Sequence, residues 1–106
     1  DITETLKNLP DAISTPEIQI PLREGENHAF VKELMNTNKL STAQNLIRID
    51  GLRAEYKSGF GLVRASNTTP VLVLRFEAGS ERELQIIKKE FKSAIIDINP
   101  DIYLPF

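Results

Sequence analysis

Cysteine is absent from this 106-residue chain, and histidine occurs once, as His28. Without cysteine the chain can form neither a disulfide framework nor a cysteine-based metal site, and one histidine cannot supply a zinc site. We expect His28 to be a solvated surface residue. The lack of cysteine fits a reducing compartment, so we expect a cytoplasmic protein.

The chain also lacks an excess of charge and any long apolar run. Lys and Arg total 13 against 15 Asp and Glu, which gives a net charge of −2, and the charges are scattered. No basic stripe is available to neutralise a nucleic-acid backbone, so DNA or RNA binding is not expected. No window has the length of a membrane span or the layout of a signal peptide, so we expect a soluble protein with no membrane partner.

The first residues suggest a piece of a longer protein. The chain opens on Asp1 without a methionine, and the amphipathic segment 2–9 is too short to be stable alone. Residues Pro10 to Pro16 contain Asp, Ser, Thr and two prolines, which is typical of a linker without helix or strand. We therefore assign residues 1–11 to the end of a preceding domain and an interdomain hinge, and residues 12–106 to one domain.

Patterning within the domain predicts strands and two helices. Ile18–Leu22 alternates as a strand, with Pro21 tolerated at an edge or strand end. Asn27 stands where an N-cap belongs, ahead of apolar residues at helical spacing, which predicts a helix over 28–36 and a polar loop over 37–44. Ser80 and Glu83 form a capping box before a second helix of about four turns. Asn99-Pro100 ends this helix and leaves an irregular tail to Phe106.

The middle of the chain reads as antiparallel strands. Residues 46–49 and 52–56 are predicted to form a hairpin, because Asp50-Gly51 supplies the positive φ angles of a two-residue turn. After a second turn at 57–59, residues 60–64 and 71–78 form two further strands. The fold class is therefore α+β, an antiparallel sheet of about four strands with two helices packed on one face.

No catalytic carboxylate pair or metal cluster is evident. Asp50 belongs to a turn, and Glu81, Glu83 and Glu90 belong to a solvated helix face. Arg64-Ala65-Ser66-Asn67-Thr68-Thr69, in contrast, gathers polar donors between two buried strands. Arginine offers a fork of donors to two phosphate oxygens, and Ser, Asn and Thr donate singly. By composition alone these residues also suit a simple turn, and Arg64 could cap carbonyls or pair with Glu55.

These six residues, with flanks Gly-Phe-Gly-Leu-Val and Pro-Val-Leu-Val-Leu-Arg-Phe-Glu, resemble the phosphate-binding loop in the C-terminal domain of the α-D-phosphohexomutases. The bacterial phosphomannomutase/phosphoglucomutase group is most similar, and the likeness runs from Thr15-Pro16-Glu17-Ile18 through Asp50-Gly51-Leu52-Arg53 to Phe106. The resemblance implies a TATA-binding-protein-like fold. It also implies an isomerase of carbohydrate metabolism that interconverts hexose 1-phosphate and 6-phosphate, of mannose or glucose, through a phosphoserine and a bisphosphorylated intermediate.

In such an enzyme this domain would bind substrate phosphate without breaking bonds. The resemblance implies that Arg64 clamps the non-transferring phosphate and that Ser66, Asn67, Thr68 and Thr69 donate to its remaining oxygens. The phosphoserine, metal and sugar-specificity loops of the family are missing from these residues. Mg²⁺ would therefore be bound elsewhere in the full-length enzyme, no cofactor by this domain, and the isolated domain would be inactive. Its partners would be the phosphosugar and other domains of the same chain. It would close over them as a mobile lid whose hinge lies between Pro10 and Pro16.

Two other classes of function remain open from the sequence. The domain could be a stand-alone regulatory module that binds an anion or small molecule. It could also be a protein-interaction domain that uses its exposed sheet face or the tail Leu104-Pro105-Phe106.

Overall fold

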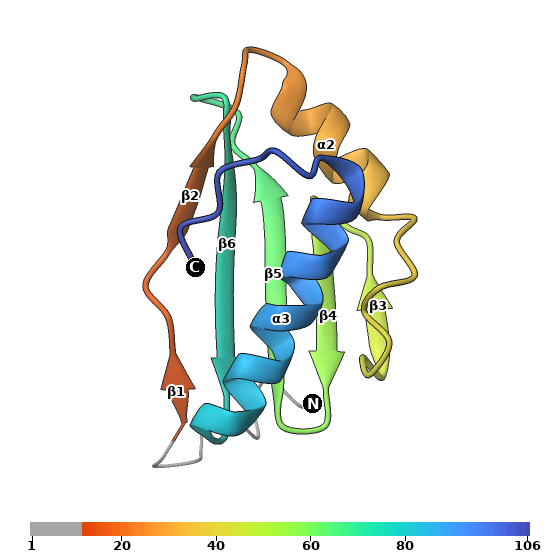
Figure 1. The fold of residues 1–106 in the computed structure, drawn as a ribbon, viewed down its shortest axis with the longest axis vertical. Helices are drawn as coiled ribbons and strands as arrows, with labels where there is room; N and C mark the ends of the chain where they lie inside the picture. The colour runs from red at the N-terminus through yellow and green to blue at the C-terminus, as the bar shows by residue number, and fades with distance from the viewer. Residues whose placement is uncertain (1–11) are drawn as a thin grey trace.

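Residues 12–106, the part described by the computed structural model, form one antiparallel sheet with two helices (Figure 1). In chain order the elements are β1 (Ile13–Ser14), β2 (Ile18–Pro21), α2 (Glu26–Leu34), β3 (Asn45–Ile47), β4 (Leu52–Tyr56), β5 (Gly59–Ala65), β6 (Val71–Ala78) and α3 (Glu81–Ile98). The predicted α+β class is confirmed, with six described strands rather than about four. None of the described helices is long and apolar enough to cross a membrane.

The strands lie in the order β1-β6-β5-β4-β3, and β2 also pairs with β6. β1 and β2 thus follow each other along one edge of β6, with Ile13 opposite Ala78 and Ile18 opposite Leu74. The Thr15 N–H donates to the Phe76 carbonyl at 2.9 Å between them. The prediction that all of 10–16 lacks strand is therefore wrong for 13–14. Of the hinge predicted between Pro10 and Pro16, residues 13–15 are held against β6, whereas residues 1–11, assigned to the preceding domain and the hinge, lie outside the described residues.

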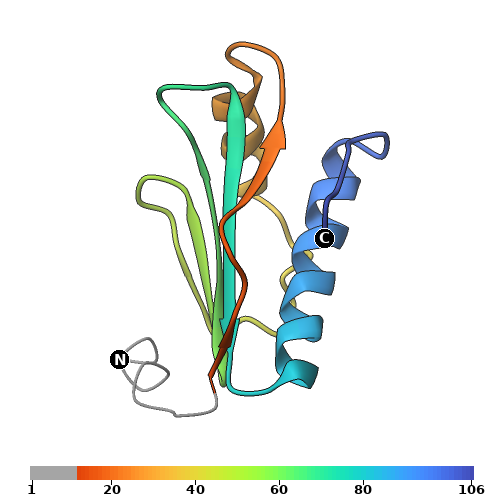
Figure 2. The same cartoon turned by 90° about the vertical axis from the view of Figure 1, so that its left-hand side faces the viewer.

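Both helices pack on the same face of the sheet, and α3 lies against its centre (Figure 2). Alternate residues of β4 and β6 point into this layer, including Leu52, Leu74 and Phe76, all at most 1% exposed. Gly61 of β5 lies directly beneath Phe91 of α3, where an added β-carbon would be 2.4 Å from the ring. The absence of a side chain at Gly61 therefore lets helix and sheet approach closely.

The last helix begins and ends as predicted. Ser80 is its N-cap, and the Ser80 Oγ accepts a hydrogen bond from the Glu83 N–H at 3.2 Å. The helix continues for 18 residues, about five turns rather than four, and Asn99 is its C-cap. The irregular tail then folds back onto the core. Leu104 and Phe106 pack against it, and the Phe106 ring centroid lies 5.4 Å from that of Phe76.

Glu90 is not the solvated residue that its place on a polar helix face suggested. Its carboxylate accepts a hydrogen bond from the Tyr56 hydroxyl at 3.0 Å and from the Thr42 N–H at 3.2 Å, and the Thr42 hydroxyl donates to it as well. Burial, with the nearby Glu90 charge, raises the pKa of Tyr56 well above its ordinary value. Glu90 therefore joins the loop over 37–44 to α3 and β4.

The connection between β3 and β4 also differs from the prediction. The last paired residues are Ile47 and Arg53, so the strands are joined by a longer loop instead of a two-residue turn at Asp50-Gly51. Both turn residues do have positive φ, 57° and 138°. A β-carbon at Gly51 would lie 2.4 Å from the Val63 carbonyl oxygen. Gly51 thus lies against the end of β5, where it continues the β4–β5 register one residue beyond Leu52 and Val63.

The first helix starts earlier than predicted, because a preceding turn initiates it. The Glu26 carboxylate accepts a hydrogen bond from the Arg23 N–H at 2.8 Å, and the Glu26 N–H donates to the Arg23 carbonyl at 2.9 Å. The N-cap is Gly25, with φ of 82°, and not Asn27. Asn27 is instead the second residue of the helix and is 2% exposed. Its side chain therefore has partners other than the helix end.

Candidate functional site

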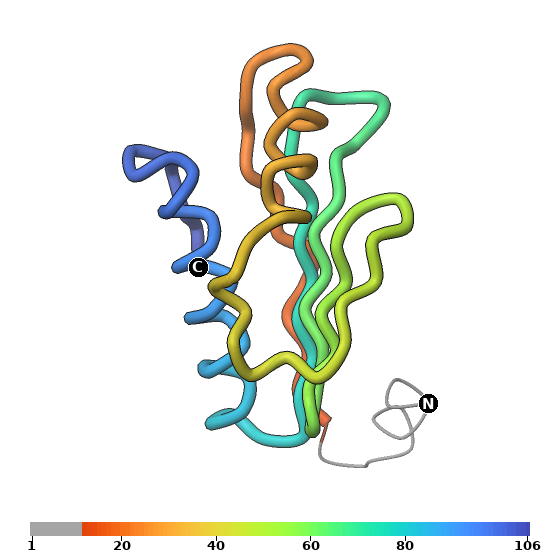
Figure 3. Tube along the Cα trace, turned by 90° about the vertical axis from the view of Figure 1, so that its right-hand side faces the viewer, coloured from red at the N-terminus to blue at the C-terminus, as the bar shows by residue number. Residues whose placement is uncertain are grey.

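The polar loop predicted as a binding site connects β5 to β6 at the end of the sheet next to α2 (Figure 3). Hydrogen bonds within it define its shape: the Ser66 N–H donates to the Val71 carbonyl at 3.1 Å, and the Val71 N–H donates to the Thr69 carbonyl at 2.8 Å. The Pro70 carbonyl accepts from the Leu22 N–H at 2.8 Å, just beyond β2. The loop is therefore a closed turn held on two sides.

The Ser66 hydroxyl lies at the centre of the loop. It accepts hydrogen bonds from the backbone N–H groups of Thr68 and Thr69 at 3.3 and 3.4 Å, and it lies 3.2 and 3.3 Å from their hydroxyl oxygens. All four distances are long compared with the usual 2.7–3.0 Å of such bonds. One hydroxyl also cannot serve four partners fully, because it has one donor and two acceptor sites. The N–H and hydroxyl groups of Thr68 and Thr69 are therefore all directed at the Ser66 hydroxyl, and each is held weakly.

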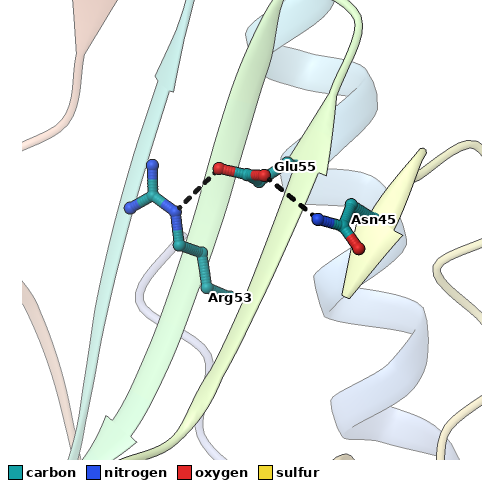
Figure 4. Close-up of polar contacts among 3 residues, drawn as sticks. All are labelled: Asn45, Arg53 and Glu55. Atoms are coloured by element: carbon teal, nitrogen blue, oxygen red, sulfur yellow. Dashed lines mark hydrogen bonds and ion pairs between the residues drawn. The ribbon is translucent and has the colours of Figure 1, made fainter. Parts of the chain in front are cut away.

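Arg64 stands exposed at the end of β5. Within residues 12–106 it forms no ion pair. The Glu55 carboxylate, considered above as a partner of Arg64, instead accepts from Arg53 Nε at 3.3 Å and from Asn45 Nδ2 at 3.4 Å (Figure 4). The pairing with Glu55 is therefore wrong. The Arg64 guanidinium keeps its charge-bearing donors at the surface beside the loop.

Asn27 contacts the loop from α2. This contact was not predicted from the sequence, in which Asn27 was expected to be an N-cap. Its side-chain Nδ2 lies 3.0 Å from the Ser66 carbonyl oxygen, 3.3 Å from that of Thr69 and 3.1 Å from that of Val71. A signal for this role is present in the sequence. Asn27 occupies the same helical stripe as Phe30, Val31 and Leu34, so a polar residue stands where the helix period requires a buried one.

A pocket of about 640 Å³ adjoins the loop, between α2 and the Asp50-Gly51 turn. Arg64 and Asn67 line it from the loop side, and Lys32 lines it from α2. Its apolar lining comes from α2, through Val31 and Met35, among others. The lining thus combines apolar surface with two cations, Lys32 and Arg64, and with the Asp50 carboxylate. The cations outnumber the carboxylate, which suits a ligand with one anionic group and a less polar body.

The structure brings some predicted site residues together and leaves others apart. Arg64 and Asn67 both line the pocket, whereas Ser66, Thr68 and Thr69 do not. The hydroxyl groups of these three residues lie together in the loop beside the pocket. Between residues 12 and 106, no three or more His, Cys, Asp or Glu side chains are placed to hold a metal ion. The arrangement offers donors and positive charge for an anion and no nucleophile with an adjacent base.

Comparison with known proteins places these features in context. Residues 17–94 match the family model described as the phosphoglucomutase/phosphomannomutase C-terminal domain. A phosphoglucomutase of Neisseria meningitidis is 50% identical over 104 residues, covering 97% of this chain and 22% of that protein. A phosphomannomutase/phosphoglucomutase of Pseudomonas aeruginosa is 42% identical over 106 residues, covering all of this chain and 23% of that protein.

A solved structure is similar as well. The crystal structure of a phosphoglucomutase/phosphomannomutase family protein from Burkholderia thailandensis superposes with a TM-score of 0.82 at 45% identity. The match covers 97% of this chain and 21% of that one. The chain therefore spans about a fifth of the length of the relatives that it matches.

Proposed function

The chain belongs to the phosphoglucomutase/phosphomannomutase C-terminal domain family, and on that basis we propose that it forms the phosphate-binding wall of a mutase active site. The full-length enzyme would interconvert hexose 1-phosphate and hexose 6-phosphate, of glucose or mannose, through a phosphoserine and a bisphosphorylated sugar. The chain covers about a fifth of each relative, so the rest of this chemistry is assigned to other domains of the same protein.

The observation that carries the proposal is the position of Arg64 at the edge of the pocket, beside a closed loop of hydroxyl groups. We assign Arg64 to two oxygens of the phosphate that is not being transferred, since the guanidinium fork matches that geometry. Ser66, Asn67, Thr68 and Thr69 donate to the remaining oxygens. Their hydrogen bonds within the loop are long, so exchanging them for bonds to a charged acceptor is favourable.

This chain contributes binding and orientation to the proposed reaction. Holding one phosphate fixes the sugar relative to the nucleophile supplied by another domain, and such positioning accounts for much of phosphoryl-transfer catalysis. The family's chemistry implies Mg²⁺, which lends positive charge to the transferred phosphate when bound. The described residues contain no cluster of three or more His, Cys, Asp or Glu that could hold this ion, and we propose that other domains of the full-length enzyme bind it.

We also propose that the domain is a lid, with its hinge in the linker between Pro10 and Pro16. Residues 13–15 pair with β6, so the hinge would be the part of this linker that precedes Ile13. A bisphosphorylated intermediate must reorient between its two phosphate-transfer steps without leaving the enzyme. A wall that closes on either phosphate and then loosens would allow this reorientation. The loop and the pocket lie at the sheet end away from β1, which is compatible with movement of the whole domain (Figure 1).

The alternative of a protein-interaction domain has less support. Leu104 and Phe106 of the tail pack on the chain's own core, with the Phe106 ring next to Phe76. The apolar groups that a partner would need are thus used internally. A stand-alone anion-binding module would use the same loop, and it differs from the mutase assignment in lacking catalytic domains upstream.

Titration of inorganic phosphate and of glucose 1-phosphate into the ¹⁵N-labelled chain tests the proposal. We expect backbone amide shifts confined to Arg64–Thr69 and the pocket, with millimolar affinity, about −4 kcal/mol, because most partner groups are elsewhere. An Arg64→Ala chain is the matched control and should lose these shifts while keeping a folded spectrum. Shifts centred on α3 or on the tail would contradict the assignment of the loop.

A further inference from the structure

Asn27 does more than fill a place in the core. We propose that Asn27 is the positioning residue of the phosphate-binding loop: its buried amide holds two loop carbonyls and that of Val71 inward and leaves the Asn67 N–H facing outward. This inference rests on the proposed function of the loop. It adds a residue from α2, nearly forty positions earlier in the chain, to a site otherwise made by Arg64–Thr69.

The contacts of Asn27 are directed almost entirely at the loop. Nδ2 donates to the carbonyl oxygens of Ser66, Thr69 and Val71 at 3.0, 3.3 and 3.1 Å. An amide nitrogen carries two hydrogens, so three acceptors use its donor capacity completely. Oδ1 accepts from the His28 N–H at 3.0 Å, which keeps the amide in this orientation. The side chain is 2% exposed and thus shielded from water. Hydrogen bonds are stronger in such a buried position than in water.

The direction of these carbonyls bears on anion binding. In a planar trans peptide the C=O and the following N–H point in opposite directions. With the Ser66 carbonyl turned to Asn27, the Asn67 N–H points away from Asn27. The Thr69 carbonyl precedes Pro70, which has no N–H. The Asn27 side chain therefore binds the carbonyl oxygen of a peptide that has no N–H to offer an anion. The Ser66–Asn67 peptide is thereby oriented with its carbonyl on the inner side of the loop and its N–H on the outer side, where an anion can accept from it.

The helix uses only the oxygen of the Asn27 side chain, which accepts from the His28 N–H, and the partners of Nδ2 lie outside the helix. The stripe neighbours of Asn27, which are Phe30, Val31 and Leu34, are apolar and buried, and an apolar residue at 27 would continue the pattern. Burying a carboxamide costs free energy unless its hydrogen bonds are made. All three hydrogen bonds that Nδ2 makes go to Ser66, Thr69 and Val71, so the donor end of the amide is explained by the loop and not by α2.

Steady-state kinetics of Asn27→Leu in the full-length mutase test the inference. Leucine keeps the number of side-chain heavy atoms and the branch at Cγ, and it continues the apolar stripe, but it is bulkier and removes the donor, so the loop should relax. We expect KM for glucose 1-phosphate to rise about tenfold with a smaller change in kcat, the loss expected when roughly one charge-assisted contact is misaligned. Amide shifts of Asn67–Thr69 should move in the ligand-free protein, whereas those of α3 should not.

Tyr56→Phe is the matched control for a merely structural effect. It also removes the hydrogen bond of a buried side chain, to Glu90. Tyr56 lies at the end of β4 opposite Gly59, away from the β5–β6 loop. It should lower the melting temperature and leave KM unchanged. An Asn27→Leu protein that behaves like Tyr56→Phe, with lower stability and normal KM, would overturn the positioning role. If Asn27→Leu does not fold, Asn27→Ser, which is smaller and keeps one donor, should show the same KM change at reduced size.

Arg64→Ala separates this inference from the proposed function. A KM that rises in Arg64→Ala and not in either Asn27 variant would leave the loop as the phosphate site and refute the role of Asn27. A KM that changes in none of these variants would refute the phosphate site itself, and the positioning role would fail with it. An increase in both Arg64→Ala and Asn27→Leu, with Tyr56→Phe normal, is the expected result.

Discussion

Replacing Arg64 by alanine in the full-length mutase should damage substrate use without damaging the fold. Arg64 is exposed and forms no ion pair within residues 12–106, so its removal should cost little stability. In a closed active site the lost hydrogen bonds to phosphate are charge-assisted, worth about 1.5–3 kcal/mol, which predicts a fall in kcat/KM of about ten- to a hundredfold. A contact that stayed in solvent would be worth at most about 1 kcal/mol, or roughly fivefold.

The assay is initial-rate kinetics with glucose 1-phosphate and mannose 1-phosphate, alongside a melting curve for each variant. Arg82→Ala, on the exposed side of α3, is the control for loss of a surface charge and should be normal. Arg53→Ala controls for loss of stability, because Arg53 pairs with Glu55 and its guanidinium carbon lies 4.1 Å from the Phe60 ring centroid. If Arg64→Ala matched these two controls in kcat/KM, Arg64 would have no phosphate-binding role.

Three further predictions concern the chain itself. Alone, with Mg²⁺ and a sugar bisphosphate, it should show no mutase turnover. Product formation above a buffer control would contradict the proposal that other domains carry the nucleophile and the metal site. Gly61→Val should destabilise by about 1–3 kcal/mol, because the new side chain meets the Phe91 ring, and a melting temperature within 2 °C of the parent would show that the core can adjust. The buried Tyr56 hydroxyl has a raised pKa, so its contribution to stability is complete below about pH 10 and declines above it, by about 1.4 kcal/mol per pH unit. Urea midpoints at pH 8–11.5 should therefore fall less steeply in Tyr56→Phe than in the parent, and parallel curves would refute this.

The elements that the sequence predicted well are those whose signals are local. The strands over 60–64 and 71–78 each extend by at most one residue beyond prediction at either end, and Ser80 caps α3 as its capping-box pattern indicated. Alternation and capping depend on neighbours within a few positions, so no distant contact was needed to find them.

The features that were missed depend on partners far along the chain. β1 has only two residues and stands between Pro10 and Pro16, so it is too short to show the alternation of a strand. It is a strand because it pairs with Glu77 and Ala78, far along the chain. Asn27 has a strong local preference for an N-cap, but the carbonyls of Ser66, Thr69 and Val71 determine its actual place. The Asp50-Gly51 turn was predicted correctly in its φ angles and wrongly in its loop length, because the two residues alone do not reveal the register that sets Ile47 opposite Arg53.

The candidate site shows the same division. The five residues that were expected to bind phosphate, Arg64 and Ser66 to Thr69, fall within one stretch of six, so the sequence alone could nominate them together. The structure adds that Arg64 and Asn67 line a pocket and that Ser66 organises the neighbouring hydroxyls. Binding of phosphate by these residues stays a prediction. The pocket wall from α2 could not be nominated, because only the folded chain brings Lys32 beside Arg64.

The place where the chain enters the sheet gives the domain a long lever arm. β1 pairs with the Ala78 end of β6, whereas the loop that carries Ser66 and Thr69 precedes its Val71 end. The length of β6, about 23 Å at 3.3 Å per residue, separates the two. A rotation of only about 10° about the residues before Ile13 would move the loop through about 4 Å over that length. This displacement exceeds the length of a hydrogen bond, so a slight turn at the entry point suffices to make or break every contact to a bound phosphate at once.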